Sequence, residues 1–272
     1  MKRSERHEPT IERLIELSGI ETLHPGGLAL SRRTGEVARF APGMKVLDVS
    51  SGRGTQALLY AREFGVDVTG VDLSEEMVRA ASVGAAEAGL SDRVRFEAAD
   101  SQRLPFAAAT FDAVINECAV GIPDDSQAVL DEMLRVVRPG GAVVIHESTW
   151  RASLTREEQA ELSDRYGTTP LEPAHWHELL RRAGAAEIRS EAEPWSRPEM
   201  FWNVRKDRVV RGPGSVLTLR ERLRTLARVL RRYGLRGAWK ALENERAFRR
   251  AVLAGKLGYS LYWAQRAEGE LP

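Results

Sequence analysis

The sequence is poor in cysteine and contains no long apolar stretch. Its single cysteine, Cys118, excludes an internal disulfide framework and a multi-cysteine metal site, and it fits a reducing compartment. No uninterrupted apolar run reaches the length of a membrane-spanning helix. The first residues, MKRSERHEPTIERL, are charged and lack the apolar core of a signal peptide. Together these absences predict a soluble, cytoplasmic protein.

An overall excess of charge is also absent, because 40 Lys and Arg residues nearly balance 39 Asp and Glu residues. The balance is uneven along the chain: residues 197–257 have a net charge of +12, whereas the remainder has −11. We therefore expect a basic element on an acidic body. Three interpretations of this element stay open: helices packed over an active site, contact with an anionic membrane surface, and nucleic-acid binding, which is the least favoured.

Strand and helix signals alternate from residue 45 onward, which predicts a parallel α/β sheet with helices on both faces. Strands are expected at 45–49, 66–71, 94–98, 111–115, 142–145, 187–193 and 259–265. Helices are expected at 55–64, 75–89, 126–137 and 173–183, in two short segments within 9–40, and in two basic runs, one from about Val216 and one over 235–254. The predicted units are an N-terminal helical lid (1–40), an α/β core (41–195), a basic helical insertion that caps the acceptor (196–257), and a closing strand and tail (258–272).

A glycine loop follows the first strand in VLDVSSGRGT, residues 46–55. Gly52, Gly54 and Ala57 fit the spacing G-x-G-x-x-G/A, in which glycines let the backbone approach a ligand. Asp72, 20 residues after Gly52, ends the next strand and can accept both hydroxyls of a ribose. These features leave NAD and S-adenosylmethionine equally open.

Three further features favour S-adenosylmethionine. Asp48 precedes the loop, where a carboxylate repels a pyrophosphate but suits an ammonium and a sulfonium. Asp100 and Ser101 follow the third strand, where a carboxylate can accept a hydrogen bond from the adenine amine. The segment VVRPGGAVVI, residues 136–145, then turns from a helix end into a strand.

These segments together resemble a class I S-adenosylmethionine-dependent methyltransferase of the small-molecule type, similar to the methyltransferase type 11 and ubiquinone-biosynthesis groups. The resemblance rests on VLDVSSGRGT, VTGVDLSEEM, FEAADSQRLPF, FDAVINECAV and LRVVRPGGAVVI, in the family's order and spacing. It implies a doubly wound, Rossmann-like sheet of seven strands with the last strand antiparallel. The cofactor-binding residues that it implies are Asp48, Ser50, Gly52, Arg53, Gly54, Thr55, Asp72, Leu73, Met77, Asp100, Ser101 and Asn116.

The acceptor side is less well defined by the sequence. The resemblance places Glu117 and His146 at the ends of the fourth and fifth strands, as candidate catalytic residues. Glu117 could be a general base or bind a cation, and His146 could deprotonate a phenol or thiol. His24 is a candidate member of the lid, and no group of residues has the sequence spacing of a metal site. Ser50 departs from the family, which usually has glycine there.

The resemblance implies methyl transfer by in-line displacement to a small, hydrophobic or lipid-like acceptor. The Asn/Asp-Pro-Pro-aromatic motif of the members that methylate nucleobases and protein amides is absent after the fourth strand, which argues against those substrates. Two alternatives stay open: an NAD(P)-dependent oxidoreductase, and a non-catalytic member of the fold that binds the cofactor or RNA. The expected partner is a small-molecule acceptor, with peripheral membrane contact through the basic insertion as a further hypothesis.

Overall fold

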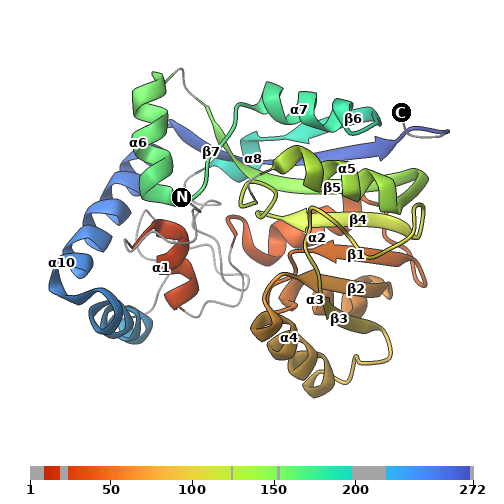
Figure 1. Cartoon of the computed structure of the whole chain (residues 1–272), viewed down its shortest axis with the longest axis horizontal. Coiled ribbons are helices and arrows are strands. Elements are labelled where there is room, and N and C mark those ends of the chain that lie inside the picture. The colour runs from red at the N-terminus through yellow and green to blue at the C-terminus, as the bar shows by residue number, and fades with distance from the viewer. Residues whose placement is uncertain (1–8, 19–23, 124, 152–153, 198–218, 270–272) are drawn as a thin grey trace.

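A seven-stranded sheet forms the centre of the molecule (Figure 1). The computed structural model describes residues 9–18, 24–123, 125–151, 154–197 and 219–269. The strand order is β3-β2-β1-β4-β5-β7-β6, and β7 runs antiparallel to both neighbours. The strands are β1 (Lys45–Val49), β2 (Asp67–Asp72), β3 (Val94–Ala98), β4 (Phe111–Glu117), β5 (Val137–Trp150), β6 (Ala185–Glu191) and β7 (Leu257–Arg266). The predicted sheet, with its antiparallel last strand, is confirmed.

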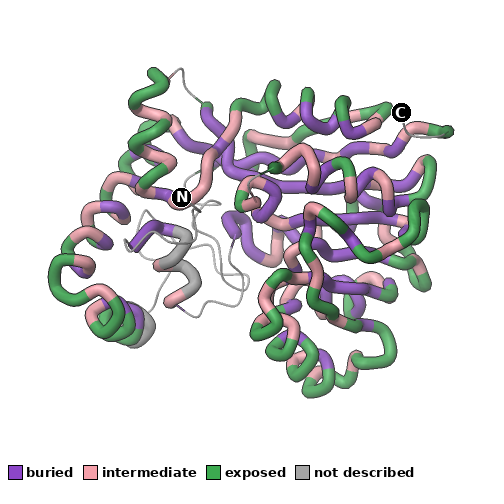
Figure 2. Tube along the Cα trace, viewed as in Figure 1, coloured by how far each residue is buried: buried purple, intermediate pink, exposed green. Residues whose placement is uncertain are grey.

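Helices cover both faces of the sheet, as the alternating sequence pattern predicts. The helices are α1 (Ile11–Ser18), α2 (Gly27–Val37), α3 (Thr55–Phe64), α4 (Glu75–Glu87), α5 (Ser126–Val136), α6 (Arg156–Tyr166), α7 (Pro173–Arg182), α8 (Glu193–Ser196) and α10 (Leu219–Leu253). Alternate residues of β1 enter different cores: Val46 packs with α3 residues such as Tyr60, whereas Leu47 packs with α5 residues such as Leu130. Figure 2 shows the buried strands between their exposed covering helices. Because side chains of a strand alternate, Asp48 points to the same face as Val46.

Three helices, α1, α6 and α10, lie together at one side of the sheet, beyond its strands (Figure 1). Apolar residues Leu14 and Leu17 of α1 pack against Val229 and Leu230 of α10. The two predicted basic runs both lie within α10, which consists of two helices that meet at a kink at Gly234, whose φ of 66° and ψ of −170° are not helical. The predicted start of the first run, at Val216, lies outside the described residues.

Helix α6 was not expected from the sequence, because its residues are mostly polar and carry no clear apolar stripe. Its start signal is a capping box, in which the Thr155 hydroxyl accepts from the Glu158 backbone N–H and the Glu158 carboxylate accepts from the Thr155 N–H. Strand β5 is also longer than the predicted 142–145, because β7 pairs with it as far as Trp150.

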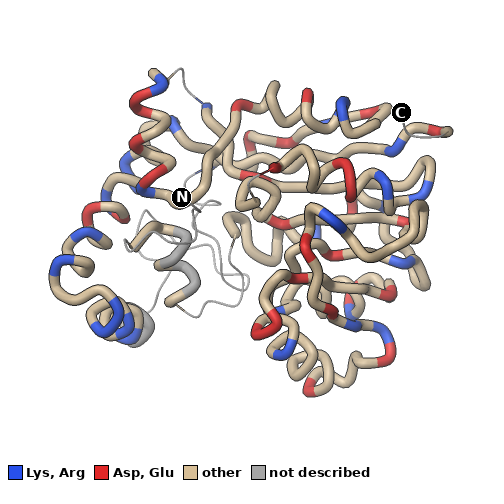
Figure 3. The backbone as a smooth tube through the Cα atoms, viewed as in Figure 1, with Lys and Arg blue, Asp and Glu red and all other residues tan. Residues whose placement is uncertain are grey.

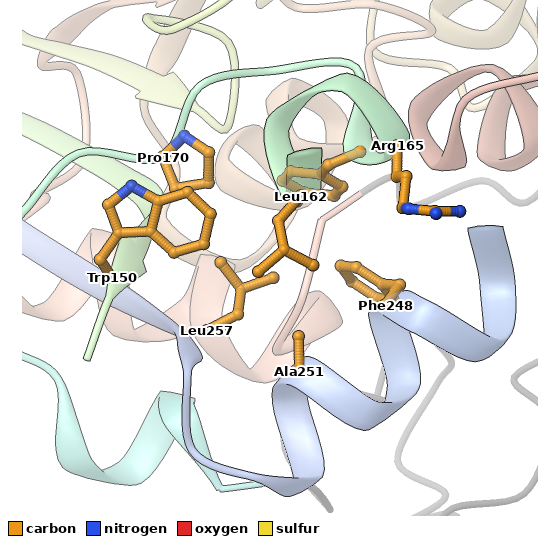
Figure 4. Close-up of a pocket in the computed structure, with 8 residues that line it drawn as sticks. Trp150, Leu162, Arg165, Pro170, Phe248, Ala251 and Leu257 are labelled. Carbon is orange, nitrogen blue, oxygen red and sulfur yellow. The ribbon is translucent and has the colours of Figure 1, made fainter. Parts of the chain in front are cut away.

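An apolar seam joins α10 to the rest of the molecule. Figure 4 shows Trp150, Leu162, Phe248 and Leu257 pointing toward one another from β5, α6, α10 and β7. The rings of Phe248 and Tyr166 stack with centroids 5.1 Å apart. The cavity left between these residues is only about 10 Å³, the space of about one water. This seam is therefore a packing contact and not a substrate pocket.

A larger hollow of about 520 Å³ lies among α2, β6, β7 and the amino ends of β4 and the parallel part of β5. Trp263, Arg189 and Asp112 are among the residues that line it. Ligands of doubly wound sheets bind beyond the carboxyl ends of the strands, at the opposite edge. We therefore place the candidate site at the carboxyl ends and not in this hollow. Among the described helices, none combines the length and apolarity that crossing a membrane requires.

Candidate active site

Parallel pairing brings the predicted site residues to one edge of the sheet. Val49 of β1 pairs with Asn116 of β4, and Glu117 pairs with His146 of β5. Asp72 ends β2 on the other side of β1. The carboxyl ends of β2, β1 and β4, and the part of β5 beside the end of β4, therefore supply Asp48, Asp72, Asn116, Glu117 and His146.

The loop after β1 is tied to the end of β2. The backbone N–H of Ser51 donates to the Val71 carbonyl at 2.9 Å, and the N–H of Gly52 donates to Asp72 Oδ2 at 2.9 Å. The other carboxylate oxygen, Oδ1, accepts from the N–H of Ser74 at 2.9 Å. Asp72 is thus held in a fixed orientation by both loops, which suits a residue that must present its oxygens to a ligand.

The glycines of this loop serve two different purposes. Gly52 has a φ of 53°, and a Cβ added to it would meet nothing within 4 Å, so the space beside its backbone is open. A Cβ on Gly54, by contrast, would lie 2.4 Å from the Phe96 ring, so Gly54 is required by packing against β3. Ser50 adopts a φ of 61°, a conformation that favours glycine, where the family usually has it.

Asp48 is the unsatisfied carboxyl group of the site. It is 2 % exposed, and its Oδ2 has no hydrogen-bond partner among the described residues. Burial raises the pKa of Asp48 well above its ordinary range, and the nearby charges of Glu117 and Asp72 raise it further. A buried carboxylate with an unpartnered oxygen is stabilised when a cation lies beside it.

The remaining predicted cofactor residues line the same edge. Asn116 is fully buried, and its Oδ1 accepts from the Ala119 N–H at 2.9 Å, while its Nδ2 has no partner within the described part of the chain. Asp100 is exposed and accepts from the Gln102 N–H at 2.9 Å. The others lie on the loops and helix starts around these groups: Arg53, Thr55, Leu73, Met77 and Ser101. Leu73, 77 % exposed, and Ser101, 8 % exposed, differ most in burial.

Glu117 is the most heavily contacted carboxylate of the site. Its Oε2 lies 2.7 Å from His24 Nε2 and accepts from the Ser31 hydroxyl at 2.9 Å. Its Oε1 accepts a short hydrogen bond from the Tyr60 hydroxyl and lies 3.3 Å from His146 Nε2. Residues from the segment before α2 and from α2, α3 and β5 therefore converge on one buried side chain of β4.

The electrostatics of Glu117 are opposite to those of Asp48. Burial alone would raise the pKa of Glu117, but His146 and His24 outweigh burial and hold this pKa well below its ordinary range. The same cluster raises the pKa of Tyr60, chiefly through burial and then through the Glu117 charge. Burial lowers the pKa of His146. Glu117 is therefore an ionised, weakly basic carboxylate, which favours a role in holding positive charge over proton removal.

Sequence reasoning did not identify Ser31 and Tyr60 as partners of Glu117. Both look like ordinary residues of amphipathic helices, and only the packing of α2 and α3 on the sheet brings them to the end of β4. His24, expected to belong to a lid, lies in the same cluster and is 1 % exposed. Although sequence spacing gives no metal site, the fold gathers His24, Glu117 and His146 with ligand atoms within 4.8 Å of one another.

The strand order, the antiparallel β7 and the acid-bearing glycine loop define the class I methyltransferase fold. A family profile described as "Methyltransferase domain" matches residues 46–141. The chain is 31% identical over 172 residues to an uncharacterized methyltransferase, YodH, of Bacillus subtilis, and the match covers 63% of this chain and 72% of YodH. The chain therefore belongs to the methyltransferase family, as the sequence predicts.

Other similar proteins match over a shorter length or at lower sequence identity. Methyltransferase GfsG of Streptomyces halstedii is 36% identical over 138 residues, which is 50% of this chain and about half, 49%, of GfsG. The geranyl diphosphate C-methyltransferase of Streptomyces coelicolor, solved with Mg²⁺, geranyl diphosphate and S-adenosyl-L-homocysteine, superimposes with a TM-score of 0.66 at 19% identity. That superposition covers 88% of this chain and 79% of the other, and it shows a shared fold.

S-adenosylmethionine is the cofactor of this enzyme, and the residues present fit it. The orphaned Oδ2 of Asp48 is the acceptor that a cationic ligand requires, and the open space beside Gly52 leaves room for a ligand to approach the backbone. Asp72 presents a fixed carboxylate where a ribose would lie. The nicotinamide cofactor of the alternative hypothesis carries a pyrophosphate, which a buried carboxylate beside the loop would repel.

Proposed function

We propose that this methyltransferase acts on a small hydrophobic or lipid-like acceptor, held between the carboxyl ends of β4 and β5 and the helices α1, α6 and α10. The observation that carries the catalytic part of the proposal is the buried, unpartnered Oδ2 of Asp48 beside the glycine loop. When bound, S-adenosylmethionine supplies an electrophilic methyl group, which the acceptor atom takes by in-line displacement. The protein contributes positioning and the exclusion of water.

Each predicted residue has a role under this proposal. Asp48 balances the positive charge of the cofactor, and Asp72 accepts the ribose hydroxyls. Asp100 accepts from the adenine amine, with Ser101 beside it. The other cofactor contacts are proposed for Ser50, Gly52, Arg53, Gly54, Thr55, Leu73, Met77 and Asn116. Glu117 and His146 form the acceptor end, where the unbonded Nε2 of His146 is the group that can receive a proton.

One comparison supports an apolar acceptor. A structural neighbour is by its own description a geranyl diphosphate C-methyltransferase in complex with geranyl diphosphate. The residues that α1 and α10 turn toward each other are also apolar, and Leu14, Leu17, Val229 and Tyr233 pack into a cluster of their own there.

Contact with an anionic membrane surface is a further part of the proposal, because it would deliver such an acceptor. Between residues 223 and 253, α10 carries nine Lys and Arg residues and two Glu. Figure 3 shows these basic positions along the helix. Leu235 and Trp239, one helical turn apart, are 82% and 63% exposed. Exposed Leu and Trp among arginines are typical of helices that lie in a membrane interface.

Calorimetric titration with S-adenosylhomocysteine, with NAD and NADP in parallel, tests the catalytic proposal. We expect micromolar binding of S-adenosylhomocysteine alone, and an acceptor screen then begins with quinols, phenols and thiols. Asp72→Ala should abolish this binding. Asp67→Ala is the matched control, because Asp67 begins the same strand at the opposite edge and is exposed. Equal affinities for the two variants would refute the site.

Co-sedimentation with phosphatidylcholine vesicles, with and without phosphatidylglycerol, tests the membrane contact. We expect binding that needs the anionic lipid, weakens with salt and is lost in Leu235→Ser/Trp239→Ser. Val83→Ser is the control, because Val83 is 57% exposed on α4, away from α10. Binding that is equal with and without phosphatidylglycerol would refute the contact. An equal loss of vesicle binding in Val83→Ser would also refute it.

A further inference from the structure

The cluster of His24, Glu117 and His146 has a hydrogen-bonding pattern that methyl transfer alone does not explain. The three residues are separated by 93 and 29 positions in the sequence, and all are nearly inaccessible, with side chains 2%, 5% and 0% exposed. Their ligand atoms, two imidazole nitrogens and a carboxylate oxygen, lie within 4.8 Å of one another.

The proton on the His24 ring can be placed from its hydrogen bonds. Nδ1 of His24 lies 2.8 Å from the Pro25 carbonyl oxygen, which can only accept, so Nδ1 carries the proton. In the neutral ring Nε2 is then a lone pair, with the Ser31 hydroxyl oxygen 3.4 Å away. That lone pair lies 2.7 Å from Glu117 Oε2, which is itself only an acceptor when ionised.

His146 lies on the other side of the carboxylate. The Tyr259 hydroxyl lies 2.9 Å from His146 Nδ1 and 3.2 Å from the His146 carbonyl oxygen, so the His146 tautomer sets whether the hydroxyl donates to Nδ1 or accepts from it. In the tautomer with the proton on Nδ1, Nε2 is a lone pair, as in His24. It is fully buried, has no hydrogen-bond partner among the described residues, and lies 3.3 Å from Glu117 Oε1.

When both rings are neutral and carry their protons on Nδ1, three acceptors face one another in a buried space. Such a contact is repulsive unless positive charge lies between the groups. The carboxylate is also oriented from outside the cluster, because Ser31 and Tyr60 donate to its two oxygens and leave its other lone pairs facing the histidines. Outer hydrogen bonds from each His Nδ1 and to the carboxylate are the usual surroundings of metal ligands.

We propose that His24, Glu117 and His146 bind a first-row divalent transition-metal ion such as Zn²⁺ or Fe²⁺. Two imidazoles and one carboxylate are the donor set that these ions favour, whereas Mg²⁺ prefers oxygen ligands. Bonds of about 2.1 Å to each ligand place neighbouring ligand atoms about 3.0–3.4 Å apart. The 3.3 Å between His146 Nε2 and Glu117 Oε1 matches this spacing. His24 Nε2 lies 2.7 Å from the other oxygen, Oε2, and the ligand atoms of the three residues lie within 4.8 Å of one another, so an ion would draw the two imidazoles closer together.

The ion would join the segment before α2 to β4 and β5 at the proposed acceptor end. There it would occupy the lone pair of His146, so that His146 would no longer accept a proton. The ion would take over that role by lowering the pKa of a bound acceptor hydroxyl. This role rests on the proposed function, but the metal site itself does not. The two are therefore tested by separate measurements, metal binding without cofactor and S-adenosylhomocysteine binding without metal.

The first experiment titrates the chelator-treated, full-length protein with Zn²⁺ by calorimetry and with Co²⁺ by visible absorption. We expect one ion per chain and Co²⁺ bands of a site with nitrogen and oxygen ligands. His24→Gln should weaken Zn²⁺ binding at least about 100-fold, while S-adenosylhomocysteine binding stays within about threefold. His175→Ala, an exposed histidine outside the cluster, should bind as the wild type does.

Three outcomes would overturn the metal site. Wild-type protein that binds neither ion means that protons supply the positive charge. Binding that survives in His24→Gln, or that His175→Ala removes, places the metal elsewhere. Should His24→Gln fail to fold by circular dichroism, X-ray absorption of the Zn²⁺-loaded wild type decides, because a shell without two imidazole nitrogens contradicts the assignment.

Discussion

Two carboxyl groups, Asp48 near the end of β1 and Glu117 at the end of β4, have side chains that are almost hidden from water, yet their surroundings are opposite. Asp48 has an oxygen without a partner and a raised pKa, whereas four side chains converge on Glu117 and its pKa is lowered. Burial acts in the same direction on both groups, so the difference comes from their neighbours. The Asp48 region is incomplete without a cationic ligand, and the Glu117 region already gathers histidines and hydroxyl donors.

Among the variants that compare these two regions, Asp48→Asn should have the largest effect, because it keeps the shape of the side chain but cannot ionise. Loss of a charge-assisted contact to the cofactor should cost about 3 kcal/mol, or roughly 100-fold in affinity for S-adenosylhomocysteine. The melting temperature should change little, because the raised pKa of Asp48 already favours an uncharged carboxyl group in the unliganded protein and the amide has the same shape. Calorimetry and thermal unfolding measure the two quantities. A variant that binds normally, or one that is strongly destabilised, would contradict this view of Asp48.

Tyr60→Phe tests the Glu117 region, because it removes one donor and little else. Hydrogen bonds to charged groups contribute about 1.5–3 kcal/mol, so urea unfolding should show a loss of that size. The matched control is Ser51→Ala on the Asp48 side, where the buried Ser51 hydroxyl has no partner among the described residues. Its free energy of unfolding should change by less than about 0.5 kcal/mol. If the two variants lost the same free energy of unfolding, the Glu117 and Asp48 regions would not differ in the way proposed.

The pH dependence of cofactor affinity gives a third test. In the unliganded protein the raised pKa of Asp48 favours its protonated form, and the charges that face it are those of Glu117 and Asp72. A cationic ligand favours the ionised form, so binding releases a proton, and affinity should rise with pH by up to about tenfold per unit below that pKa. Because the pKa of Asp48 is higher in the folded than in the unfolded protein, the free energy of unfolding of the unliganded protein should also fall as the pH rises through the folded pKa. Calorimetry in buffers of different ionisation enthalpy measures the proton release, and Asp48→Asn should abolish it.

The smallest effect is expected from Ser50→Gly, which relieves the backbone without touching either carboxyl group. A serine with a φ of 61° is strained relative to glycine, and removing its Cβ should stabilise the protein by about 1 kcal/mol. Thermal unfolding measures this gain, with Gly52→Ser as the reverse substitution at another position of positive φ. A destabilised Ser50→Gly would mean that the serine hydroxyl makes a contact that outweighs the strain.

The sequence predicts the cofactor side of this comparison better than the acceptor side. The bounds predicted for β1 and α3 are those found, because apolar alternation and the glycine loop are local signals. Parallel pairing then brings Asp48 and Asp72 together from adjacent strand ends. The Glu117 cluster depends instead on His24 and Tyr60, which reach it only through helix packing. No spacing within the sequence encodes such a meeting, so those partners could not be predicted.

The position of β7 in the sheet has a consequence for the order of folding. Strand β6 pairs with β7, which begins 66 residues after β6 ends and lies between β5 and β6. During synthesis β6 therefore cannot pair until β7 has been made. Helix α10, which lies between them in the sequence, emerges before that pairing forms. Contacts of such long sequence separation form slowly. The basic helix is thus made while the edge of β5 is still open, and β7, which follows it in the sequence, joins β6 to the other five strands.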